Sequence, residues 1–215
     1  MSAFPNTSKG VKKIRTSEIL GLIATIVMAI GSILLLTAGI AGTQGEMTEE
    51  LTVGVTATAG IGVVIFAIGA VIALIGLFVE ISGLRIAGGD HQYFKYGLYV
   101  VIAQIVLTGI AAIPAFSGAK TWVSLFADVA DIIVMLLVVE GCMALCKKVG
   151  DEELAARGKK VENTVLTMSI LSTLCDVFSG VNIATTIMAI AHVVLVVVVF
   201  FMYMGYLKAI GKKFA

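Results

Sequence analysis

The sequence predicts an all-α, polytopic integral membrane protein, built as a bundle of six transmembrane helices with both termini cytoplasmic. Three observations lead to this fold class. Of the 215 residues, 59% are hydrophobic and 13% are charged, and the mean hydropathy is +1.07, whereas soluble domains carry about 25% charged residues. The apolar residues fall into long runs, as in helices that cross a bilayer. Lys and Arg gather in alternate polar stretches, as in cytoplasmic loops.

The first helix follows a polar, basic segment at residues 1–16. Such a start could open a secretory signal, but the apolar run from Ile19 to Ala41 is about 23 residues long, beyond the roughly 7–15 of a cleavable core. The sequence therefore predicts an uncleaved first span at about 17–42. A short acidic loop separates it from a second span at about 53–78.

Three glycines in the second span, Gly62, Gly69 and Gly76, recur every seven residues. This spacing places them on one stripe of a slightly supercoiled helix. Small residues on one stripe let another helix backbone approach closely in lipid. We therefore predict a packing seam there, with a pore lining as the alternative.

The third helix follows a polar connection at 79–92, in which Asp90 is predicted as the helix N-cap. The third span runs over about 93–113 and stops at Pro114, a residue that commonly ends helices. Gln104 is the strongly polar residue within it, near mid-depth. A lone amide in lipid is expected to hydrogen-bond a neighbouring helix.

The rest of the chain holds three more apolar stretches and two basic ones. The 147–163 linker is predicted as a short charged helix on the membrane surface, and the membrane domain as a whole covers 17–208. The remaining elements follow in order: a fourth span at about 122–146, the linker, a fifth and rather short span at 164–179, a sixth span at 183–207, and a basic tail at 209–215.

The distribution of basic residues predicts the orientation. With six spans, fourteen of the fifteen Lys and Arg residues lie on one side, and only Lys120 lies opposite. Cytoplasmic loops carry the excess of Lys and Arg, so both termini are expected inside, in a bacterial or archaeal plasma membrane. Six spans also permit an inverted three-plus-three repeat. The halves show no sequence match, and that question stays open.

Acidic residues inside the spans are the strongest functional signal, because carboxyl groups at membrane depth usually face a partner, a cavity or a pathway. At 1.5 Å per residue, Asp128 and Asp131 lie roughly 10 and 14 Å below the outer end of their span. His192 reaches a similar depth on the sixth span. The predicted ion-binding residues are an outer polar cluster with mid-depth and inner partners: Asp128, Asp131, Asp176, His192, Gln104 and Glu140.

Plainer interpretations stand beside these. Asp128 could lie at the membrane boundary, where the helix N-terminus favours a carboxylate. His192 could be a hydrogen-bonded packing residue, and His91 is expected to be solvated. No ligand spacing supports a metal, and the two histidines are too far apart in depth to hold one haem. The sequence therefore predicts no cofactor.

The three cysteines form no disulfide framework. Cys142, Cys146 and Cys175 are expected to act as small apolar packing residues, because a free cysteine behaves as a small hydrophobe. Lipidation of Cys146 at the membrane interface is the sharper alternative.

The motifs that the chain lacks, and its charge, argue against several classes of function. The chain has no H-E-x-x-H, no G-x-S-x-G, no C-x-x-C and no P-loop, so no enzyme is predicted. A net charge of +1 without a concentrated basic face disfavours nucleic-acid binding. Two functions remain: a small transporter or channel-like protein for protons, cations or a small cationic solute, with Asp131 as main binding group, or a non-catalytic subunit or scaffold. The expected partners are the lipid bilayer and a second copy or another membrane protein.

Overall fold

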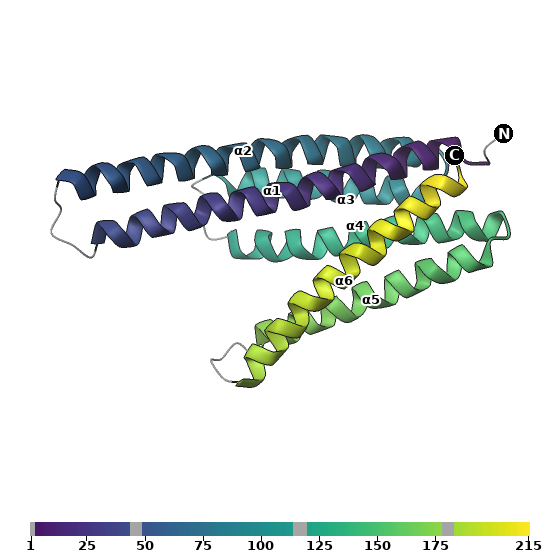
Figure 1. The fold of residues 1–215 in the computed structure, drawn as a ribbon. Helices are drawn as coiled ribbons and strands as arrows, with labels where there is room; N and C mark the ends of the chain where they lie inside the picture. The colour runs from purple at the N-terminus through teal and green to yellow at the C-terminus, as the bar shows by residue number, and fades with distance from the viewer. Residues whose placement is uncertain (1–2, 44–48, 114–119, 178–182) are drawn as a thin grey trace. The chain divides into compact units, whose positions relative to one another are not determined.

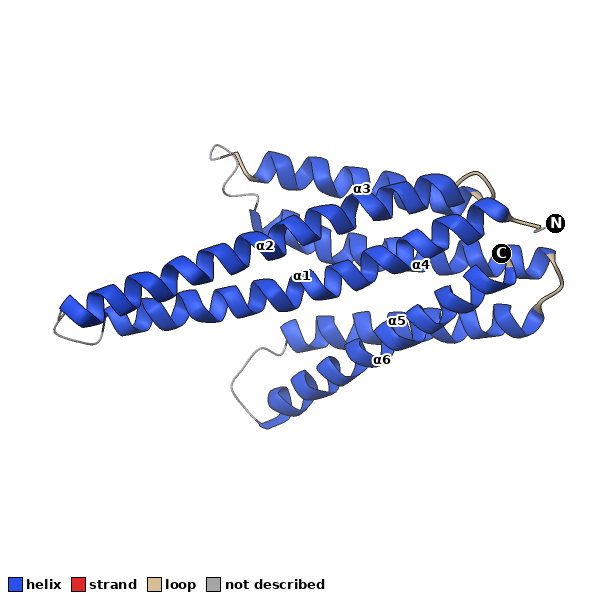
Figure 2. Cartoon of the chain, turned by 45° about the horizontal axis from the view of Figure 1, so that its top comes forward, coloured by secondary structure: helices blue, strands red, loops and turns tan. Residues whose placement is uncertain are grey.

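The computed structural model describes residues 3–43, 49–113, 120–177 and 183–215, and every regular element within them is an α-helix (Figures 1 and 2). This confirms the all-α prediction, and each predicted span overlaps one helix. The helices are α1 (Pro5–Thr43), α2 (Glu49–Ala87), α3 (Gln92–Ala111), α4 (Lys120–Lys148), α5 (Glu152–Val177) and α6 (Ile183–Lys213). The predicted stop at Pro114 lies outside the described residues.

Five helices contain a described stretch that is long and apolar enough to cross a membrane, which confirms the membrane-protein class. These stretches are Pro5–Ala41, Gly54–Ala87, Gln92–Ile110, Val129–Lys148 and Ile190–Lys213. α5 is not among them, because its first half carries many charges. The predicted span at 164–179 also runs past the described part of α5. A sixth crossing therefore stays a prediction.

Several helices continue beyond the predicted spans at their basic ends. α2 runs to Ala87, so the polar loop predicted at 79–92 is helical for most of its length. α5 is continuous from Glu152, so the separate surface helix predicted within 147–163 is wrong. The stretch that begins α5 is rich in residues of good helix propensity, and the 79–87 stretch contains no proline to interrupt α2. Loss of hydrophobicity marks the edge of the lipid, whereas a helix ends only where a residue stops it.

Such a stop separates α4 from α5. Gly150 has a positive φ of 73°, and the Asp151 N–H donates to the Cys146 carbonyl at 2.9 Å, while the Gly150 N–H donates to the Lys147 carbonyl at 3.1 Å. This pair of hydrogen bonds is the Schellman arrangement that ends many helices. A side chain at position 150 would be strained, because L-residues rarely adopt that φ.

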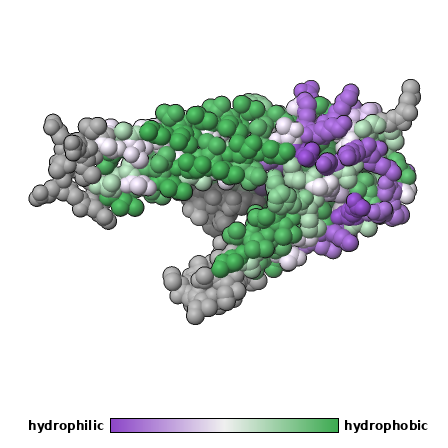
Figure 3. Space-filling model, in the orientation of Figure 1, coloured by the Kyte–Doolittle hydropathy of each residue, from purple (hydrophilic) through white to green (hydrophobic). Residues whose placement is uncertain are grey.

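The chain divides into two compact units, and each is described by itself. Unit 1 comprises Met1–Lys12 and Ile81–Ala215, and unit 2 is Lys13–Glu80. In unit 1, α3 packs against α4, α4 against α5, and α5 against α6 (Figure 1). Hydrophilic residues of this unit gather around the α4–α5 connection and the end of α6, whereas hydrophobic residues cover the middle turns of α6 (Figure 3).

The core of unit 1 lies at this hydrophilic end. Its buried large side chains come mainly from the second halves of α4 and α6, the middle of α5, the first half of α3, the end of α2 and the residue after α6. They include Leu84, Phe94, Val138, Val139, Leu145, Val165, Tyr203, Leu207, Ile210 and Phe214. In water, burying such side chains drives packing. Between helices in lipid this drive is absent, because the lipid is as apolar as the side chains. Dense packing at the polar end is the expected result.

The two terminal segments of unit 1 pack on each other. The Phe4 and Phe214 rings meet edge to face, with centroids 5.4 Å apart. The buried Ser8 hydroxyl donates to the Gly211 carbonyl at 2.9 Å. The basic tail is therefore the last turn of α6, held against the start of α1.

Unit 2 is a helical hairpin of α1 and α2 with glycines at its seam. A Cβ at Gly69 would lie 2.5 Å from Met28 Cγ and 3.1 Å from the Ala24 carbonyl oxygen. Gly31 on α1 approaches Gly62 just as closely, since a Cβ at Gly31 would lie 2.9 Å from the Gly62 carbonyl oxygen. At Gly76 the spacing relaxes to ordinary contact. The stripe of small residues faces the other helix, as close packing in lipid requires.

Candidate functional site

The polar contact between membrane-depth side chains joins α3 to α4. Gln104 Nε2 donates to Asp131 Oδ1 at 3.0 Å and lies 3.5 Å from the Ala127 carbonyl oxygen. Gln104 is half-buried, whereas Asp131 is exposed on the surface of the chain. Two of the residues singled out in the sequence thus lie together. A carboxylate has about four lone-pair positions, and the Gln104 amide donates to one oxygen of Asp131.

The other members of the predicted outer cluster are only partly described. The side chains of Asp128 and Asp176 lie outside the described part of the chain. His192 is half-buried on α6. The first half of α6 lies beside α5 and diverges from α4 in both views (Figures 1 and 2). Within the described residues, no three His, Cys, Asp or Glu side chains form a group that could hold a metal ion.

Glu140 lies in a different setting. It is half-buried and lines a groove of about 490 Å³ between the end of α4 and the start of α5, together with Lys147, Lys159 and Lys160. Nine residues separate Asp131 from Glu140, about two and a half helical turns, so the two carboxylates lie on opposite faces of α4. A relay from one to the other would need groups from other helices. Glu140 belongs to the basic end of the unit.

The α2–α3 connection provides the N-caps of two helices. The sequence analysis predicts Asp90 as the N-cap of α3, and this prediction is wrong. The N-cap of α3 is His91, whose Nδ1 accepts a hydrogen bond from the Tyr93 N–H at 3.3 Å. Burial and the charge of Lys148 lower the pKa of His91, which keeps Nδ1 free to accept. Asp90 instead reaches α1: its Oδ2 accepts from the Thr7 N–H at 2.5 Å and from the Thr7 hydroxyl at 2.8 Å. Asp90 therefore caps α1.

Asp151 connects the start of α5 with the end of α6. Its Oδ1 accepts from the Leu154 N–H at 3.0 Å, which makes it the N-cap of α5. Its Oδ2 lies 2.7 Å from Lys213 Nζ. These two contacts, the one with Lys213 first, lower the pKa of Asp151 below its usual 3.8. One carboxylate thus holds a helix start and the chain's last helical turn.

We predict that this carboxylate makes stability depend on pH at the acid end. A pKa lowered in the folded state contributes stability above the ordinary pKa, and this contribution is lost as pH falls through the folded value. The melting temperature in detergent micelles should therefore fall more steeply between about pH 5 and pH 3 in the wild type than in Asp151→Asn. Asparagine retains the cap but not the ion pair. Equal slopes for the two proteins would contradict the role of Asp151.

The cysteines described belong to the core. Cys142 and Cys146 are both fully buried, at 0% exposure. A buried thiol is not available to a lipid-transferring enzyme, so the lipidation of Cys146 considered from the sequence is not supported, and the packing interpretation holds for both. The side chain of Cys175 lies outside the described residues.

The sequence analysis missed one set of residues, which lines a groove between α5 and α6. Arg157, Lys160 and Val161 lie at i, i+3 and i+4 on α5 and so share one face, and they line the groove with Phe201 and Tyr206 of α6. This spacing is visible in the sequence. The interpretation of 147–163 as a charged surface linker does not predict a groove on one face of it.

Comparison of the chain with protein-family models, with curated proteins and with solved structures gave no match.

Proposed function

We propose that the protein moves protons or a small cation across the membrane, with Asp131 as the group that binds it. The observation that supports this proposal most is the Gln104–Asp131 hydrogen bond of 3.0 Å between two apolar helices. Lipid tails offer no hydrogen bonds, so the polar atoms of this pair need partners in the protein or in water. Transport through it requires only that Asp131 bind and release positive charge.

The exposure of Asp131 adds a second argument. A charged acid at the centre of a transmembrane helix costs about 2.5–3.5 kcal/mol, and less nearer the interface. Asp131 nevertheless lies on the surface of the chain. The exposed Asp131 is therefore expected to meet a water-filled pathway or a second copy of the chain rather than lipid tails. In a water-filled pathway, the carboxylate lies where an ion can reach it.

Gln104 has a positioning role in this proposal. Its amide donates to one carboxylate oxygen of Asp131 and also approaches the Ala127 carbonyl, which fixes the direction of the carboxylate. An amide donor also stabilises the charged form. The pair thus keeps the acid ready to bind a cation.

The test is a flux assay in liposomes with Asp131→Asn. Asparagine retains an oxygen that can accept from Gln104, so the helix contact survives while the charge is lost. We expect proton or cation flux to fall about tenfold or more, because hydrogen bonds to charged groups contribute about 1.5–3 kcal/mol. Undiminished flux, with the melting temperature unchanged, would remove Asp131 from the mechanism.

A control substitution separates an effect of Asp131 from a general loss of negative charge. Glu153→Gln removes one negative charge from the exposed Glu153–Arg157 pair, in which the Glu153 side chain is 79% exposed. This variant should retain wild-type flux. If both variants reduce flux equally, net charge rather than Asp131 governs the assay.

The second candidate is a non-transporting membrane subunit or scaffold, which one observation favours. Only 11% of the apolar window of α1 and 17% of those of α2 and α3 are buried within the chain. The remaining surface is available to lipid or to a partner protein. Under this function, Asp131→Asn would lower assembly or the melting temperature, and the wild type would conduct nothing in the same liposomes.

A further inference from the structure

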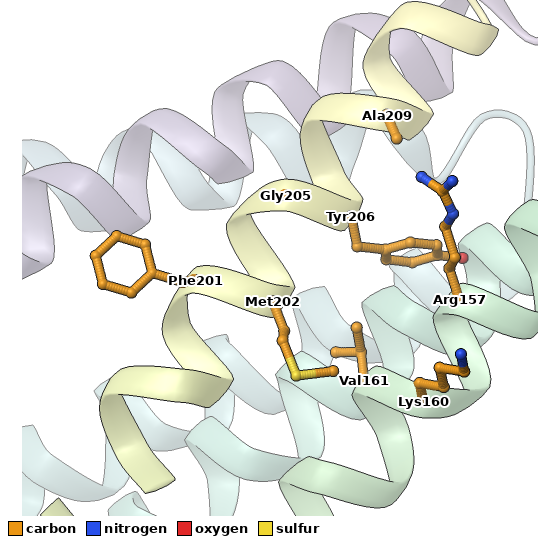
Figure 4. A pocket seen from close by; sticks show the side chains of 8 residues that line it. All are labelled: Arg157, Lys160, Val161, Phe201, Met202, Gly205, Tyr206 and Ala209. Atoms are coloured by element: carbon orange, nitrogen blue, oxygen red, sulfur yellow. The ribbon is translucent and has the colours of Figure 1, made fainter. Parts of the chain in front are cut away.

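We propose that the groove between α5 and α6 is a binding site for one anionic phospholipid. The groove has a volume of about 290 Å³. Charged and apolar side chains divide its lining, as Figure 4 shows. The residues are Arg157, Lys160, Val161, Phe201, Met202, Gly205, Tyr206 and Ala209.

The charged part comes from α5 alone. Arg157 donates to Glu153 Oε1 at 2.7 Å, and its side chain is 61% exposed, so several of its five N–H donors remain available. Lys160 makes no ion pair among the described residues and is exposed. The groove therefore carries one cation that forms no ion pair among the described residues and one cation that can share its donors. A phosphate group satisfies both.

The apolar part comes mainly from α6. Phe201 is 69% exposed. Met202 of α6 lies beside Val161 of α5, whereas the Phe201 ring points away from them (Figure 4). The Tyr206 ring contributes a wall, while its hydroxyl is buried deeper, where a Cβ at Gly158 would lie 2.6 Å from it. This hydroxyl is not a ligand donor. The apolar side chains run from the charged end toward the exposed valines of α6, as an acyl chain would.

The location of the groove identifies the occupant. α6 is long and apolar enough to cross a membrane, and the groove lies near its basic end, where Lys208, Lys212 and Lys213 follow. Basic pockets between helices at the cytoplasmic membrane surface bind the head groups of anionic lipids. A soluble anion would bind the charged side chains but would leave the apolar half of the groove uncovered. A phospholipid covers both.

The test measures lipid binding by native mass spectrometry on protein exchanged from detergent into mixed phosphatidylglycerol and phosphatidylcholine. The wild type should retain phosphatidylglycerol preferentially. Arg157→Gln combined with Lys160→Gln should lower this retention, by about fivefold for each cation removed, because each contributes about 1 kcal/mol near the membrane surface. Gly205→Leu tests the apolar half: a Cβ there meets nothing within 4 Å, so the side chain fills the groove without disturbing the helix and should also lower retention.

Lys159→Gln is the matched control. Lys159 precedes Lys160 on the same helix but pairs with Glu162 at 2.7 Å and does not line this groove. Its substitution should leave the lipid preference unchanged. Equal loss in Lys159→Gln and in the double variant would overturn the proposal, since only general surface charge would then matter. Equal retention of both lipids by the wild type, or displacement of the bound lipid by free inorganic phosphate, would overturn it as well.

Discussion

Replacing Gly31 by alanine should destabilise the α1–α2 hairpin by about 1–3 kcal/mol, the usual cost of overpacking. A Cβ at this position would lie 2.7 Å from the Phe66 amide nitrogen and 2.9 Å from the Gly62 carbonyl oxygen. Both are backbone atoms, which no rotamer change can move. The helices would have to separate along the seam, and contacts such as Gly69 with Met28 would loosen together.

Two other glycines of α1 provide the control. A Cβ at Gly21 or at Gly39 meets nothing within 4 Å. Alanine at either position should be neutral or stabilise α1 by up to about 1 kcal/mol, because glycine is a poor helix former. Thermal melting in detergent, followed by circular dichroism, measures all three variants. If Gly31→Ala melts like Gly21→Ala, the close approach of the two backbones is contradicted.

Replacing Asp90 by alanine should cost about 2–3 kcal/mol, because it removes a charged acceptor from the start of α1. The carboxylate accepts from Asn6 Nδ2 at 3.0 Å and from both the N–H and the hydroxyl of Thr7. The N–H of Thr7 is among the first of α1 and has no partner within that helix. A negative charge at a helix N-terminus is also favoured by the helix dipole.

A double-mutant cycle with Thr7→Ala measures this interaction directly. The hydroxyl of Thr7 donates to Asp90, so the two substitutions should be less than additive, because each removes part of the same network. Urea titration or thermal melting gives the free energies of unfolding. Strict additivity would show that Asp90 acts on stability through some other contact.

Much of the fold follows from the sequence because lipid imposes a simple rule on helices. Apolar runs long enough to cross the bilayer must be helical, and the run around Gly62 and Gly69 could be placed on α2 from composition alone. The helix ends were harder to place. α2 continues to Ala87 and α5 begins at Glu152, since hydropathy changes at the lipid boundary while helix propensity does not.

The candidate site was predicted less completely, for a physical reason. Gln104 and Asp131 stood out because polar residues are rare in such runs, and these two do form a hydrogen bond. The role of Asp90 depends on a partner 83 residues away in the sequence, which no local pattern reveals. Asp90 next to a helix start resembles an ordinary N-cap, and only the three-dimensional arrangement identifies the helix it serves.

The contact between the chain's two ends has a consequence for biosynthesis. Ser8 donates to a carbonyl 203 residues further along, and Phe4 meets Phe214. At a translation speed of about 5–20 residues per second, these partners are synthesised roughly 10–40 s after the first turn of α1. Unit 1 therefore closes only after α6 has been synthesised, and until then the nascent chain exposes the apolar groups that α6 and Phe214 will cover.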